Sequence, residues 1–175
     1  PVLFTQLRPG MVDKKTGREK IFKMYKFRTM TDQKDESGNL LPDEVRLTKF
    51  GAWLRSTSLD ELPEIFNILK GDMSIIGPRP QLVRDMVFMT DEQRMRHTAK
   101  PGLSGLAQVN GRNYVSWEDK FKMDLEYISK ISFWNDVKIV IQTVLVVLKH
   151  ENIDTGSYIK KDGVIYRPLD VERSE

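Results

Sequence analysis

Residues 58–71, with the sequence SLDELPEIFNILKG, limit the possible folds of this chain more narrowly than any other segment. Apolar side chains recur every third or fourth residue from Leu62 to Leu69, which predicts one apolar stripe on a helix over 59–70. Pro63 has no N–H group to donate, so it is tolerated only near the first turn. Gly71 is suited to the left-handed residue that ends a helix, so the segment has a defined start and stop.

Shorter patterns predict the other elements, and strands do not alternate regularly with long helices, so a doubly wound parallel sheet is not expected. We predict one compact α/β domain, α+β-like, with short, largely antiparallel strands and several helices, some of them amphipathic. In the first half of the chain we expect a strand over 2–6 ending in the turn LRPG, a strand over 20–30, an irregular loop over 31–47, a helix over 49–55 capped by Thr48, and a strand and rigid turn over 73–80. In the second half we expect a helix over 90–97 with capping-box spacing at Thr90 and Gln93, and a shaped loop over 100–112. A helix over 117–130 opened by Ser116 and Asp119 and an apolar helix over 135–149 follow.

Composition fits a folded domain over residues 1–150, followed by a polar tail over 151–175 that is extended or loose. The chain has 175 residues, of which 39% are hydrophobic and 30% charged, and it has no cysteine, which excludes disulfides and thiolate sites. No apolar run is long enough to cross a membrane. Residues 1–30 hold eight Lys or Arg against two acids, which indicates either a polyanionic partner (nucleic acid, anionic membrane or phosphorylated substrate) or a solvated basic face.

The adjacent carboxylates Asp60 and Glu61 have two interpretations. Glu61 lies three residues after Ser58, the spacing of a capping box, and Asp60 would then be a favourable charge at a helix start. The same helix start would lower the pKa of Asp60 and offer free N–H groups to phosphate oxygens. An ionised carboxylate beside a metal-holding one suits covalent phosphoryl chemistry.

Three other segments carry candidate anion-binding side chains. Arg79 lies between two prolines in GPRP, a stiff mount that suits either phosphate recognition or a structural salt bridge. The glycine-rich loop over 100–112 carries Gln108 and Arg112, and the strand sequence YKFRTM carries Lys26 and Arg28, which alternate with aromatic residues as in a half-buried strand. Either segment could contact phosphates or be purely structural.

The two histidines share no ligand spacing, so His97 and His150 are expected to be surface residues and not zinc ligands. Without a nucleophile elbow, the chain also gives no support for a Ser-His-Asp hydrolase.

Taken together, TQLRPG, IFKMYKFRTM, SLDELPEIFNILKGDMSIIGPRP and KPGLSGLAQVNGR…SWEDKFKMDLEYI closely resemble the bacterial sugar transferase family, the small monotopic phosphoglycosyl transferases. The resemblance extends to about residue 150. It implies that a sugar 1-phosphate passes from a UDP-sugar to undecaprenyl phosphate, with release of UMP, in a ping-pong reaction that starts glycoconjugate or exopolysaccharide synthesis.

The resemblance also implies roles for particular residues. Asp60 would be the nucleophile that forms a phosphosugar-aspartyl intermediate, and Glu61 would help to hold Mg²⁺. Substrate-binding roles would fall on the remaining candidates, with structural salt bridges as the alternative for Arg28 and Asp124. These candidates are Arg28, Arg79, Gln108, Arg112 and Asp124.

Relatives carry a hydrophobic segment before the strand that begins here at Val2, so we expect that an upstream segment has been removed. The resemblance places the protein on the cytoplasmic face of the bacterial inner membrane, with no nucleic acid partner. The helix over 135–149 and nearby helices would lie at the bilayer interface, and simple core burial is the alternative.

Two other functions stay open at this point. One is a non-catalytic basic module that binds a membrane surface or nucleic acid by charge, and the other is a nucleotide-sugar pyrophosphatase with water as acceptor. No residue assigns the sugar, since members of the family that the chain resembles use galactose, glucose or N-acetylated amino and diamino sugars. The compact length resembles the small members that use an N-acetylated amino or diamino sugar.

Overall fold

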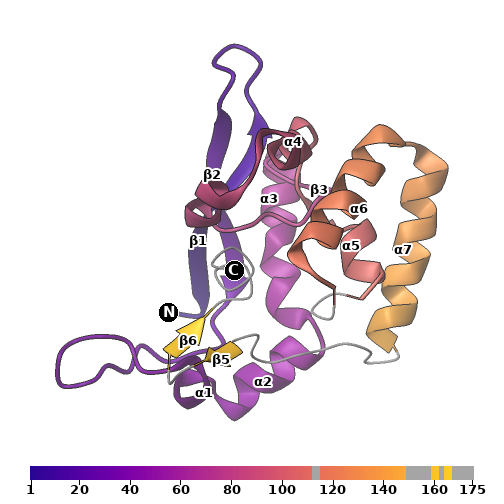
Figure 1. Ribbon diagram of the computed structural model, residues 1–175. Coiled ribbons are helices and arrows are strands. Elements are labelled where there is room, and N and C mark those ends of the chain that lie inside the picture. Colours follow the sequence, from indigo (N-terminus) through magenta and orange to yellow (C-terminus); the bar gives the residue numbers. More distant parts are fainter. Residues whose placement is uncertain (112–114, 149–158, 162–163, 167–175) are drawn as a thin grey trace.

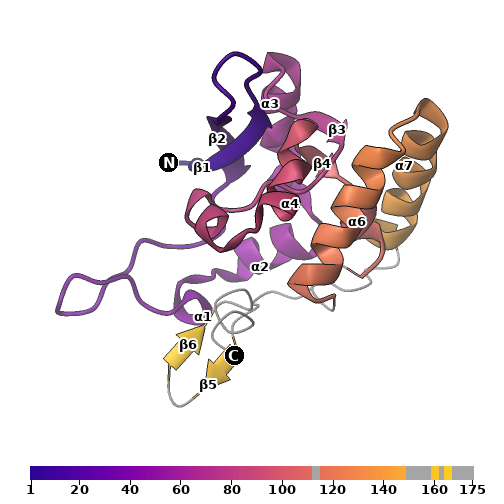
Figure 2. The ribbon, with the colours of Figure 1, turned by 45° about the horizontal axis from the view of Figure 1, so that its top comes forward.

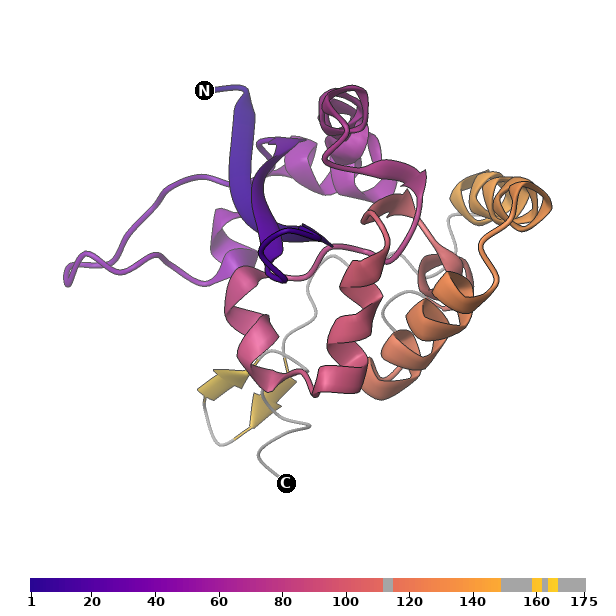
Figure 3. The same cartoon turned by 90° about the horizontal axis from the view of Figure 1, so that it is seen from above.

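The computed structural model describes residues 1–111, 115–148, 159–161 and 164–166 (Figure 1). Helices and short strands are mixed, and the strands of these residues form two-stranded sheets, which confirms the predicted α/β class. Figures 2 and 3 show a hairpin on one side, the two longest helices on the other, and several short helices between them.

The hairpin at the N-terminal end is formed by β1 (Leu3–Val12) and β2 (Glu19–Phe27). The strands are antiparallel, and an irregularity between Pro9 and Val12 interrupts their register. The strand β1 continues through LRPG with this irregularity, so the predicted turn there is wrong. Gly10 is required at this point, because a Cβ would lie 2.9 Å from the Lys20 carbonyl oxygen.

The strand β3 (Ser74–Ile76) pairs with β4 (Gly102–Ser104) in parallel, whereas the other strand pairs of the described residues are antiparallel, as expected for most of the strands. Three-residue strands carry too little pattern to show their direction in the sequence. The pairing depends on glycine, because a Cβ on Gly102 would lie 2.1 Å from the Gly77 backbone nitrogen. It brings the GPRP turn beside the loop that the sequence singled out over 100–112.

The predicted helix over 59–70 divides into a 3₁₀ helix, η1 (Leu59–Glu64), and α3 (Ile65–Lys70), which ends at Gly71 as expected. The capping box is wrong: Ser58 is in the left-handed conformation, with φ of 57°, and its side chain makes no capping hydrogen bond.

The polar side of η1 and α3 faces inward, toward β2. Asn67 is fully buried, donates to the Lys23 carbonyl at 2.8 Å and accepts from the Tyr25 N–H at 3.0 Å. The apolar stripe faces outward instead, since half or more of each of its side chains is exposed. These side chains are Leu62, Ile65, Phe66 and Leu69.

The helix α2 (Lys49–Ser56) begins as predicted at Thr48, whose hydroxyl accepts from the Gly51 N–H at 2.8 Å. Gly51 allows α2 to pass close to the end of the hairpin, because a Cβ would lie 2.0 Å from the Thr29 carbonyl oxygen. The preceding loop is irregular, as expected, and includes the short helix α1 (Asp43–Arg46).

Four short elements follow β3 and lead to the two long helices. They are η2 (Val83–Phe88), α4 (Asp91–Arg94), η3 (Met95–Thr98) and α5 (Leu106–Val109). The capping box of Thr90 and Gln93 is confirmed at the start of α4. His97 is buried in η3, so its predicted surface position is wrong. Its buried position is explained by a polar partner, because His97 Nδ1 lies 3.2 Å from the Glu19 carboxylate.

The two long helices are α6 (Trp117–Ser129), capped by Ser116 as predicted, and α7 (Phe133–Leu148). Tyr127 of α6 and Ile139 of α7 pack with Ile76 of β3 in one hydrophobic cluster. Ile139 is nevertheless the one buried residue of α7, and half of the helix is exposed, so simple core burial does not account for its apolar sequence. No helix in the described part of the chain has both the length and the apolar character to cross a membrane.

Within the predicted C-terminal tail, β5 (Ile159–Lys161) and β6 (Val164–Tyr166) form an antiparallel pair. The remaining residues of the tail and His150 lie outside the described residues.

Because the polar face of α3 points inward, two substitutions on this helix should lower the free energy of unfolding by different amounts. Asn67→Ala should lower the free energy of unfolding by about 2–3 kcal/mol, because two backbone groups of β2 lose their partners. Leu69→Ala is the matched control and should change it by less than about 0.5 kcal/mol, because the side chain is 77% exposed. Urea denaturation measures both, and a larger loss for Leu69→Ala would contradict this packing.

Candidate active site

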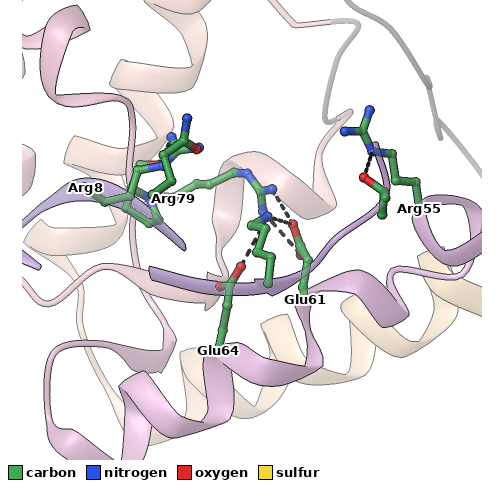
Figure 4. A network of polar contacts seen from close by, with 9 residues as sticks. Arg8, Arg55, Glu61, Glu64 and Arg79 are labelled. Carbon is green, nitrogen blue, oxygen red and sulfur yellow. Dashed lines mark hydrogen bonds and ion pairs between the residues drawn. The ribbon is translucent and has the colours of Figure 1, made fainter. Parts of the chain in front are cut away.

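The candidate site forms where η1, β2 and the GPRP turn meet. η1 supplies Asp60 and Glu61, β2 supplies Lys26 near its end, and Arg79 reaches in from the turn after β3. Figure 4 shows Glu61 and Arg79 pointing toward each other, with Glu64 on the same side of the helix as Glu61. Segments far apart in the sequence therefore place their charges in one cluster.

Glu61 is the centre of this cluster. Its Oε1 accepts from Lys26 Nζ at 2.7 Å and also from Arg79 Nη2, while Arg79 Nη1 approaches Oε2 to 3.4 Å. Burial alone would raise the pKa of Glu61, but the positive charges of Arg79 and Lys26 outweigh it and hold the pKa well below its ordinary value. Glu61 is therefore ionised and held from two sides.

Glu64 lies one helical turn further on and is almost completely buried. Lys26 Nζ lies 3.2 Å from its carboxylate, so a single ammonium group bridges Glu61 and Glu64. Burial raises the pKa of Glu64, the Lys26 charge opposes this, and the neighbouring negative charge of Glu61 raises it further.

Asp60 differs from its neighbour, because its carboxylate has no hydrogen bond or ion pair with the described residues. Burial raises the pKa of Asp60 against the attraction of Lys26, Arg79 and Arg55. The predicted lowering of its pKa by a helix start is therefore wrong. The physical reason is burial, which disfavours the charged carboxylate, and the negative charge of Glu61 adds to it. The N–H of Glu61 is also not free, because it donates to the Ser58 carbonyl at 3.3 Å.

Sequence reasoning did not include Glu64 or Arg55 among the candidates, and it considered Lys26 as a possible phosphate contact or strand residue but not as a partner of Glu61. Arg55 lies at the end of α2, where its Nε donates to the Thr29 hydroxyl at 3.1 Å, as Figure 4 shows. Only a weak sequence pattern pointed to Glu64, which follows Glu61 at the i+3 spacing of one helical face. Its partner lies in a strand that no local pattern connects to this helix.

The remaining predicted residues lie elsewhere. The amide Nε2 and Oε1 of Gln108 are buried without a hydrogen-bond partner among the described residues, and Gln108 lies close to Gly105 beside the GPRP turn. Asp124 forms a buried ion pair with Arg96. Arg112 lies outside the described residues.

Arg28 forms a surface contact on the other side of the hairpin end. Its Nη1 donates to both carboxylate oxygens of Asp32, at 2.9 and 2.8 Å. It lines an open pocket of about 580 Å³ whose other walls include Phe27, Phe50 and Leu54, but not the carboxylates of η1. The ion pair that the sequence left as one alternative for Arg28 is therefore present, and its substrate-binding role stays a prediction.

The described residues can hold Mg²⁺ only if phosphate oxygens of a substrate supply further ligands. Among the residues that the structure describes, no three acidic or histidine side chains come together as a metal site. Magnesium is often held by one or two carboxylates together with substrate phosphates. The carboxylate of Asp60 and Oε2 of Glu61 match that pattern, because Oε1 of Glu61 is shared by two cations and Oε2 has only the longer contact, 3.4 Å, with Arg79 Nη1.

Comparison with known proteins gives matches that cover most of the chain. The family described as bacterial sugar transferase matches residues 1–150. EpsL of Bacillus subtilis, named an uncharacterized sugar transferase, is 50% identical over 159 residues, which are 91% of this chain and 76% of that protein.

Two longer relatives have more specific names. The UDP-glucose:undecaprenyl-phosphate glucose-1-phosphate transferase of Klebsiella pneumoniae is 41% identical over 154 residues, 82% of this chain and 32% of that protein. The undecaprenyl-phosphate galactose phosphotransferase of Salmonella typhimurium is 37% identical over 155 residues, 78% of this chain and 33% of that protein. The chain thus spans about a third of each of these two relatives. With a family match over residues 1–150, the chain belongs to the bacterial sugar transferases.

Proposed function

We propose that this chain transfers a sugar 1-phosphate from a UDP-sugar to undecaprenyl phosphate and releases UMP, with Asp60 as nucleophile. The observation that carries the proposal is the contrast within the dyad: Glu61 is held by two cations, whereas Asp60 is unpartnered beside the same cations. The names of the Klebsiella and Salmonella relatives support this type of transfer.

The reaction takes place in two displacements at one phosphorus atom. An oxygen of Asp60 forms a bond to the sugar-bearing phosphorus, the bond to the bridging oxygen breaks, and the electron pair leaves with UMP. Undecaprenyl phosphate then attacks the same phosphorus, and the Asp60 carboxylate departs unchanged. The covalent intermediate divides a difficult transfer into two easier steps and predicts ping-pong kinetics.

The surrounding cations suit the charge of the diphosphate. Lys26, Arg79 and Arg55 all act electrostatically on Asp60, so a diphosphate bound next to this carboxylate meets three positive side chains. Glu61 keeps Lys26 and Arg79 in place before the substrate binds. Asp60 and Glu61 would hold Mg²⁺ together with the diphosphate, and the bound ion would supply further charge neutralisation.

The exposed apolar stripe begins one residue after the dyad. Leu62, Ile65, Phe66 and Leu69 project from η1 and α3, and α7 adds further exposed apolar side chains. These surfaces fit contact with the cytoplasmic face of the bacterial inner membrane, which is where a lipid-linked acceptor is found. The site then lies next to the layer that contains the acceptor phosphate.

Removal of the nucleophile gives the most direct test. Asp60→Asn should lower UMP release from a UDP-sugar by roughly 10³-fold or more, because the covalent step is lost. Asp91→Asn is the matched control, since Asp91 also precedes a glutamate in the first turn of a helix and should keep wild-type turnover. UMP release, with a panel of UDP-sugars, Mg²⁺ and undecaprenyl phosphate, measures both.

Mass spectrometry without acceptor adds a second readout of the same variants. The wild type should gain the mass of one sugar phosphate, and Asp60→Asn should gain none. A non-catalytic binding module would release no UMP, and a pyrophosphatase would release free sugar phosphate without a lipid product. Full activity of Asp60→Asn would contradict the assignment of the nucleophile.

The raised pKa of Asp60 predicts a limb in the pH profile. Only the carboxylate attacks, so the rate of the first half-reaction should fall as the pH drops through a pKa above the ordinary 3.8. Lys26 lowers this pKa, so Lys26→Met should move the limb to higher pH. Stopped-flow UMP release across pH measures the shift, and an acid limb that moves to lower pH in Lys26→Met would contradict the model of charge coupling.

A further inference from the structure

The backbone that carries Arg79 is held at three consecutive carbonyl groups. The Gly102 N–H donates to the Pro78 carbonyl at 3.0 Å, Arg96 Nη2 donates to the Arg79 carbonyl at 2.7 Å, and Arg8 Nη1 donates to the Pro80 carbonyl at 2.9 Å. Figure 4 shows Arg8 next to Arg79. Because the donors come from β4, η3 and β1, the turn is fixed from three directions.

Of the two arginine donors, Arg96 is the more deeply buried, with 1% of its surface exposed. Its Nε donates to Asp124 Oδ2 at 2.9 Å, and Nη2 lies 2.6 Å from the same oxygen while it also reaches the Arg79 carbonyl. The guanidinium packs over the Phe121 ring at 5.4 Å. A planar fork with several donors is needed for this arrangement, and a lysine ammonium does not reproduce it.

Stability alone is a weak reason to bury such a pair. The desolvation of two charges offsets most of their attraction, and an apolar pair of similar size is often as stable or more so. What an apolar pair would not provide is the hydrogen bond that Arg96 donates to the Arg79 carbonyl. That bond acts on the one residue of the turn whose side chain reaches Glu61.

We propose that Arg96, oriented by Asp124, is a positioning residue that fixes the backbone from which Arg79 reaches Glu61 and the diphosphate. This inference rests on the function proposed above and deepens it. Arg79 has a long side chain, so a small rotation of its backbone moves the guanidinium by a large amount. A displacement of about 1 Å in a positioning group costs up to 100-fold in rate.

The test replaces the buried pair by apolar side chains in Arg96→Met/Asp124→Leu, which leaves no unpaired charge. The matched control is Arg94→Met/Glu19→Gln, which removes another multidentate arginine–carboxylate pair that does not touch the turn and keeps an acceptor for His97. Both variants are first checked for folding by thermal denaturation.

We expect kcat for UMP release to fall about 10- to 100-fold in Arg96→Met/Asp124→Leu, with KM for the UDP-sugar changed by less than about threefold. The control should stay within about threefold of wild type in both constants. A folded Arg96→Met/Asp124→Leu variant with wild-type kcat would overturn the proposal, and so would an equal loss in the control.

A readout without substrate separates this inference from the proposed function. The Nε–Hε group of Arg79 is followed by ¹⁵N relaxation, and its order parameter should fall in Arg96→Met/Asp124→Leu and not in the control. If the wild type released no UMP from any sugar, the proposed function would fail while this measurement still decided the positioning role. If the double variant did not fold, Arg96→Lys would be measured in the same two assays, and wild-type kcat and order parameter would overturn the proposal.

Discussion

The contact of Glu61 with Lys26 and Arg79 is the interaction on which the rest of the site depends. It joins β2, η1 and the turn after β3, and those segments have no regular backbone pairing with one another. A buried carboxylate is costly unless it is paired and hydrogen-bonded, so two cations have to be present where η1 packs. The ion pairs of Lys26 and Arg79 with Glu61 therefore fix the start of η1, and with it the position of Asp60.

The same requirement explains why η1 and α3 turn their polar side inward. Glu61, Glu64 and Asn67 each find a partner on β2, so the apolar stripe is left facing outward. Helical periodicity predicted the stripe and its limits, but a stripe does not specify whether protein or lipid covers it. The exposed stripe and the proposed nucleophile therefore share a cause: both follow from the face that packs on β2.

Features set by neighbouring residues could be predicted from the sequence, whereas features set by distant partners could not. Thr48, Thr90 and Ser116 cap their helices as expected, and Gly71 ends α3, because each depends on residues three or four positions away. Ser58 fails as a cap because Glu61 finds partners 35 and 18 residues away. The parallel pairing of β3 with β4 has the same origin, since it depends on backbone contact between Gly77 and Gly102. Within the site, resemblance and the two prolines indicated the dyad and Arg79, but no local pattern connects Lys26 to η1.

The two adjacent carboxylates differ in their contacts, and their pKa values are displaced in opposite directions as those contacts require. Glu61 gains two cationic partners that outweigh burial, whereas Asp60 is desolvated with attraction only from a distance. A carboxylate with a raised pKa is the more basic of the pair and has unused lone pairs, as a nucleophile requires. A carboxylate with a lowered pKa has its charge committed to holding Lys26 and Arg79. Exchange of the two roles would require Glu61 to release both cations at the moment when the diphosphate needs them, so the geometry favours Asp60 as the attacking group.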